Sequence, residues 1–112
     1  NFAMPDNLAD DIPRRTAILQ QRPGEDGRVE LMQFVGLDGA DFSERAVPPN
    51  LGILSVRLPV EDLERALTGA TSQGGASFCA PARIALAPYG EVDHACVRSP
   101  AGIVVELFAP AR

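Results

Sequence analysis

Two segments of this 112-residue chain share one sequence pattern, and that pattern constrains the fold more than any other feature. In each segment an apolar strand is followed by a proline, a glycine and then Val-Glu-Leu, at residues 29–31 and again at residues 105–107. The glutamates of the two tripeptides are Glu30 and Glu106. We interpret the pattern as an internal repeat of a β-hairpin, with turns that differ in length by one residue.

The first hairpin is predicted from strands at residues 16–21 and 28–34, because the sequence RPGEDG between them is rich in turn-forming residues. Residues 1–13 are polar and acidic and contain two prolines, so we expect a loop there. Residues 36–50 combine glycines, prolines and mixed charges, a composition that predicts a linker without packing of its own.

After this linker the pattern predicts a strand, a helix and three further strands. Residues 51–58 are apolar and β-branched, which favours a strand that Pro59 ends. From Val60 the apolar residues recur at helical spacing until Gly74 and Gly75, so one amphipathic helix is expected. Residues 76–80 and 83–87 are short strand segments broken by Pro81 and Pro88, and a hairpin of residues 92–98 and 103–108 completes the three strands.

Composition excludes several classes of function. A chain that is 46% hydrophobic and 22% charged can form one ordinary core, and no apolar run approaches the roughly 18 residues of a membrane span. The net charge is −5 and the ten basic residues, all arginine, are dispersed, which argues against nucleic-acid binding. The absence of lysine excludes Schiff-base chemistry. Cys79 and Cys96 lack metal-site spacing, so we expect free thiols and a cytoplasmic location.

Two motifs carry a resemblance to a known family. The sequence VEDLERA at residues 60–66 is similar to the V-x-D-L-x-x-A helix start of the vicinal oxygen chelate superfamily, which includes glyoxalase I, bleomycin-resistance proteins and extradiol dioxygenases. Residues 97–108, VRSPAGIVVELF, resemble the ending of the same module, with Ser99 and Ala101 where acidic residues are usual. The resemblance covers residues 51–110.

The resemblance implies an α+β fold built from βαβββ modules. Residues 51–112 would be a complete second module, residues 36–50 the linker, and residues 1–35 the last two strands of an incomplete first module. Family members pair two modules to form an open cup. We therefore expect either a homodimer or a fragment of a longer two-module chain, and we favour the fragment.

In the family a divalent metal lies at the base of the cup, on ligands from the first and last strands of both modules. The resemblance thus implies Glu106 and Glu30 as metal ligands, while Ser55 stands where the family often has histidine. Two carboxylates alone bind Zn, Ni, Fe or Mn weakly, so Ser55→His should strengthen binding. The alternative for Glu106 is a solvated carboxylate on the outer face of an edge strand.

The only histidine of the chain, His94, shares a strand face with Cys96 and Arg98 by simple alternation. His94 is either a general base, or an anion-binding partner of Arg98, or an ordinary surface residue. A Cys96–His94 nucleophile is rejected because alternate residues of a strand lie about 6.5–7 Å apart.

The Ser55 hydroxyl either donates a hydrogen bond to a substrate oxygen or bonds to a neighbouring backbone carbonyl. Tyr89 is predicted in a turn at the rim of the cup, where its ring either stacks on a ligand or covers the sheet. Cys79 is expected to be buried filler.

Three functions remain open. The first is a metal-dependent isomerase, lyase or dioxygenase, in which Glu106 moves a proton. The second is a metal-free module that binds a small molecule in the cup. The third is a structural role, in which this chain is a degenerate half that only completes the cup of another module. None of the three functions involves a nucleic-acid or a membrane partner.

Overall fold

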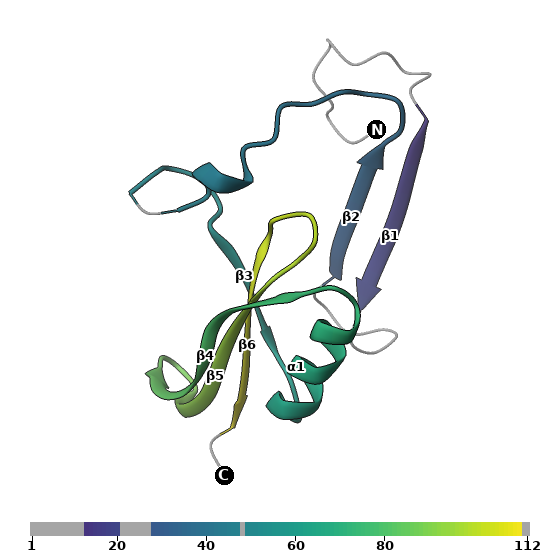
Figure 1. Ribbon diagram of the computed structural model, residues 1–112. Helices are drawn as coiled ribbons and strands as arrows, with labels where there is room; N and C mark the ends of the chain where they lie inside the picture. Colours follow the sequence, from purple (N-terminus) through teal and green to yellow (C-terminus); the bar gives the residue numbers. More distant parts are fainter. Residues whose placement is uncertain (1–12, 21–27, 48, 111–112) are drawn as a thin grey trace. The chain divides into compact units, whose positions relative to one another are not determined.

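The computed structural model describes residues 13–20, 28–47 and 49–110 (Figure 1). The predicted loop at residues 1–13, apart from Pro13, and the turn at residues 22–27 lie outside the described residues. The chain divides into two compact units, Asn1–Ala40 and Asp41–Arg112, and the boundary falls within the segment predicted to be a linker.

The first unit contains the predicted hairpin. Strands β1 (Arg14–Gln20) and β2 (Arg28–Phe34) form a two-stranded antiparallel sheet. The ladder runs from Arg14 opposite Phe34 to Gln20 opposite Arg28. Most side chains of both strands are exposed, as expected for a sheet of only two strands.

The second unit follows the predicted order of strand, helix and three strands, so this order and the α+β class are confirmed. Its elements are a short 3-10 helix η1 (Ser43–Arg45), β3 (Ser55–Pro59), α1 (Leu63–Ser72), β4 (Ala76–Leu86), β5 (Gly90–Arg98) and β6 (Val104–Pro110). The four strands form one sheet in the order β3-β6-β5-β4. β3 is parallel to β6, and the other neighbours are antiparallel.

Two strand predictions differ most from the structure. β3 begins at Ser55 rather than residue 51, because its ladder with β6 starts where Ser55 pairs with Val104. β4 is one strand through Pro81 rather than two short ones. It tolerates the proline because it lies at the sheet edge and its register shifts between Cys79 and Ala82.

Helix α1 begins at Leu63 rather than Val60. The Asp62 carboxylate accepts a hydrogen bond from the Arg65 backbone N–H at 2.9 Å, which makes Asp62 the N-cap. The helix ends before Gly74, whose φ of +88° suits glycine.

The short helix η1 lies within residues 36–50, the segment predicted to be a linker. A Cβ atom built on Gly102 would collide with the Ser43 side chain, so η1 approaches the β5–β6 turn closely. Composition did not reveal this contact because it depends on a glycine nearly 60 residues further along the chain.

The sheet has two different faces. Strand alternation places Ala95, Val97, Leu107 and Ala109 on the face that α1 covers, and all four are buried. The residues between them point to the opposite side, which we call the helix-free face. From β3, β6 and β5 it carries Ser55, Arg57, Val104, Glu106, Phe108, Val92, His94, Cys96 and Arg98. A small apolar core of Leu86, Val92 and Phe108 lies on this face.

The two hairpins correspond residue by residue along their ladders. β2 and β6 have seven residues each and align Glu30 with Glu106. Ile18 lies opposite Glu30, and Cys96 lies opposite Glu106. Seven residues separate β1 from β2 and five separate β5 from β6, so the turns differ by two residues and not by the predicted one.

Candidate functional site: a polar cluster around Glu106

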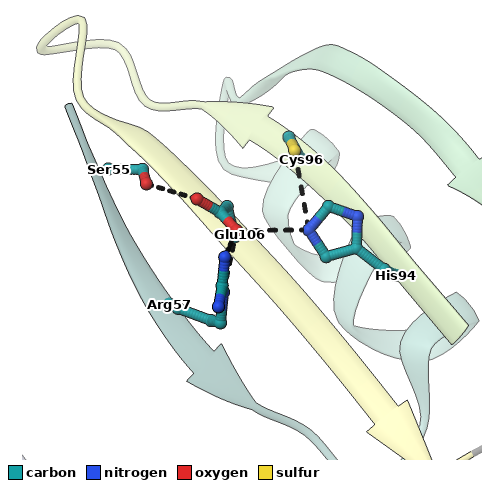
Figure 2. Close-up of polar contacts among 5 residues, drawn as sticks. All are labelled: Ser55, Arg57, His94, Cys96 and Glu106. Atoms are coloured by element: carbon teal, nitrogen blue, oxygen red, sulfur yellow. Dashed lines mark hydrogen bonds and ion pairs between the residues drawn. The ribbon is translucent and has the colours of Figure 1, made fainter. Parts of the chain in front are cut away.

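Glu106 lies at the centre of the helix-free face. Its strand β6 is between β3 and β5, so the alternative of a solvated carboxylate on an edge strand is wrong. Only 17% of the side chain is exposed. The Ser55 hydroxyl donates to Glu106 Oε1, while Arg57 Nε donates to Oε2 at 2.8 Å and Arg57 Nη2 forms an ion pair with Oε2 at 2.7 Å (Figure 2).

The ladder register explains why these side chains meet. Arg57 pairs directly with Glu106 in the parallel β3–β6 ladder, and Cys96 pairs with Glu106 from the other side. Ser55 precedes Arg57 by two residues and therefore shares its face. Figure 2 shows the side chains in front of the sheet, with the helix behind it.

The surroundings of Glu106 stabilise its ionised form. The hydrogen bond from Ser55 lowers the pKa of the Glu106 carboxyl below its usual value, and the Arg57 and His94 contacts lower it further. Partial burial opposes this effect without reversing it. Glu106 is therefore a carboxylate at neutral pH.

His94 belongs to the same cluster. Its Nε2 atom lies 3.4 Å from Glu106 Oε2, and 14% of its side chain is exposed. His94 is thus partly buried beside Glu106 and is not an ordinary surface residue.

Cys96 approaches His94 more closely than the sequence argument allowed. The Cys96 Sγ atom lies 3.9 Å from His94 Nε2, because the two side chains lean toward each other while their Cα atoms keep the strand spacing. The predicted separation of about 6.5–7 Å was therefore wrong for the side-chain tips.

The rejection of a Cys–His nucleophile nevertheless stands for another reason. Burial raises the pKa of the Cys96 thiol to about 12, with a further contribution from the neighbouring thiol of Cys79. A neutral thiol is a poor nucleophile. Cys79 lies opposite Cys96 in the β4–β5 ladder and is half-buried rather than buried.

Two predicted binding residues flank the cluster. The Tyr89 ring packs against Phe108 with centroids 4.8 Å apart and is largely exposed, so Tyr89 lies at the edge of the helix-free face. The Arg98 guanidinium lies over the Phe78 ring at 4.6 Å. Arg98 alternates with Cys96 and therefore shares its face.

The residues present do not fit a divalent metal. Glu30 is exposed in the first unit, and Glu106 Oε2 is already hydrogen-bonded and ion-paired with Arg57. Among the described residues, no group of three or more His, Cys, Asp or Glu side chains could hold a metal ion. The metal ligands that the resemblance implied are thus too few, and Glu106 is already occupied by Arg57.

Arg57 is the residue that sequence reasoning missed. The available signal was its spacing, since a charged residue two positions after Ser55 must share the face of Ser55 in a strand. The contact itself depends on the parallel β3–β6 register, which pairs Arg57 with Glu106 and is not evident from local sequence.

Comparisons with protein-family models, with curated proteins and with solved structures found no match to this chain. In the ranges that the structure describes, no helix is long and apolar enough to cross a membrane.

Proposed function

We propose that the second unit binds a small organic molecule on its helix-free face, without a catalytic metal ion. One observation carries this proposal: Arg57 already neutralises the Glu106 carboxylate, and Ser55 hydrogen-bonds to it. Such a network offers a ligand hydrogen-bonding groups and a cation, but no open set of metal donors.

The resemblance to the vicinal oxygen chelate superfamily supports this proposal. The order of strand, helix and three strands is the one expected for a βαβββ module. The helix-free face would then be one wall of a cup, with Glu106 at its centre and Tyr89 at its rim. The β1–β2 hairpin would correspond to the last two strands of a first module.

Metal-dependent isomerase, lyase or dioxygenase chemistry has less support. Arg57 competes with any metal ion for Glu106, and His94 is the only histidine in the sequence. A metal site would need imidazole donors from elsewhere.

Titration calorimetry with Zn²⁺ tests the metal-free part of the proposal. We expect the wild type to bind weakly, with a dissociation constant above about 100 μM, because its donors are few and already paired. Ser55→His adds a nitrogen donor but leaves Arg57 on Glu106, so we expect a small gain. Ser55→His combined with Arg57→Met should bind at least tenfold more tightly than Ser55→His alone.

Arg83→Met is the matched control for the loss of an arginine, because Arg83 is ion-paired with Asp93 elsewhere in the sheet. Tight stoichiometric binding of Zn²⁺ by the wild type would refute a metal-free site. Native mass spectrometry against a small-molecule library tests the binding function itself, and the absence of any bound compound would contradict it.

A further inference from the structure

The Arg57 guanidinium has hydrogen-bonding groups that Glu106 does not use. A guanidinium has five N–H donors, and Arg57 directs Nε and Nη2 to the single oxygen Oε2 of Glu106. No further hydrogen bond joins Arg57 to a described residue, and 45% of its side chain is exposed. The guanidinium is therefore held in place by one edge and accessible at another.

The helix-free face is positive in an acidic protein. The chain has a net charge of −5, yet this face of β3, β5 and β6 carries Arg57 and Arg98 against the single carboxylate of Glu106. An anion is therefore attracted to this side of the sheet.

The face of the sheet that α1 covers is negatively charged around its hollow. A hollow of about 700 Å³ lies between the start of α1 and the sheet. One arginine, Arg83, lines it together with the carboxylates of Glu61, Asp62, Glu64 and Asp93. An organic anion would be repelled there, which leaves the helix-free face as the anion-binding side.

An exposed aromatic ring lies on the same face as Arg57 and Glu106. Phe108 follows Glu106 by two residues on β6, about 6.5–7 Å along the strand, and is itself buried, while the Tyr89 ring that packs on it is exposed. A ligand with both a charged end and an apolar body can contact the cation and the Tyr89 ring.

We propose that Arg57 binds the carboxylate of a small organic acid whose apolar part lies against the Tyr89 ring. This inference rests on the proposed function and names its ligand class. The planar guanidinium matches a carboxylate geometrically, and a charge-assisted hydrogen bond of this kind is stronger than a neutral one. Glu106 is a positioning residue here, because it fixes the orientation of Arg57 without contacting the ligand.

Titration of ¹⁵N-labelled protein by NMR with three probes tests this inference. The probes are phenylacetate, its neutral isostere phenylacetamide, and inorganic phosphate, which has charge but no apolar body. We expect phenylacetate to shift the amide signals of β3, β5 and β6 and to bind at least tenfold more tightly than either of the other two.

The variants separate Arg57 from general charge effects. Arg57→Met should weaken phenylacetate binding at least tenfold, and so should Arg57→Met combined with Glu106→Gln, which leaves no unpaired carboxylate behind. Arg83→Met removes the same charge on the other face and should change the affinity less than twofold.

Equal binding of phenylacetate and phenylacetamide would overturn the inference while leaving the proposed function intact. Equal losses in Arg57→Met and Arg83→Met would overturn it as well. Tight phosphate binding would point to an inorganic anion instead of an organic acid. If no compound of a broad library shifts these signals, both the inference and the proposed function fail.

Discussion

The hairpins β1–β2 and β5–β6 have corresponding strands and ladders but very different surroundings. Leu31 is 46% exposed, whereas the equivalent Leu107 is 7% exposed beneath α1. Glu30 is exposed, whereas Glu106 lies among Ser55, Arg57 and His94. The sequence repeat thus produces the same local structure twice and a polar cluster only once.

The difference teaches that the hairpin alone does not create the site. In the second unit β3 adds a parallel neighbour to β6 and supplies both Ser55 and Arg57. In the first unit β2 has only β1 beside it among the described residues. Burial and charge compensation therefore come from the neighbours of the hairpin.

The largest expected contrast concerns the paired leucines. Leu107→Ala should destabilise the second unit by about 2–5 kcal/mol, because it opens a cavity under α1. Leu31→Ala should cost less than about 1 kcal/mol, since that side chain keeps much of its contact with water. Urea unfolding followed by far-ultraviolet circular dichroism measures both units, and the fluorescence of Tyr89, the only tyrosine, reports on the second unit alone. Equal losses of stability would show that Leu31 is buried in solution, by a partner that completes its sheet.

The next contrast concerns thiols at equivalent positions. Cys96 is buried and has a pKa raised to about 12, so iodoacetamide at pH 8 should modify it on the order of 100-fold more slowly than in urea. The thiol introduced by Ile18→Cys replaces an exposed side chain and should react at close to its unfolded rate. Peptide mass spectrometry follows both sites in one sample. Fast native labelling of Cys96 would contradict the packing described for the cluster.

The smallest expected contrast concerns the two glutamates. Glu106→Gln should lower the free energy of unfolding by about 1–2 kcal/mol at pH 7, because it weakens charge-assisted hydrogen bonds, whereas Glu30→Gln should have almost no effect. The pKa of Glu106 is lowered in the fold, so its stabilising contribution is complete above the pKa of unfolded glutamate, about 4.3. The contribution is lost as the pH falls through the lower folded pKa.

Urea unfolding of the wild type and Glu106→Gln at several values between pH 7 and pH 3 measures this effect. The two stability curves should stay parallel down to about pH 5 and converge below about pH 4. A difference that is constant over the whole range would show that Glu106 acts through shape and not through its charge.

The sequence by itself determined the local structure of this protein. Alternating apolar residues and turn signals predicted both hairpins, and the spacing from Leu63 to Ala70 predicted the helix. These patterns are local, because strand and helix periodicity involve residues within a few positions of one another. The prediction that Pro81 divides β4 was wrong for the same reason: local sequence does not show that β4 lies at the edge of the sheet, where a proline is tolerated.

Only the tertiary structure decided which side chains meet. Ser55 and Arg57 reach Glu106 across about 50 residues of sequence, and this contact depends on the parallel β3–β6 register. The approach of Cys96 to His94 depends on side-chain direction rather than on backbone spacing. Charge compensation and burial are properties of such long-range contacts, which is why a ligand position predicted from sequence became an ion-paired carboxylate in the folded protein.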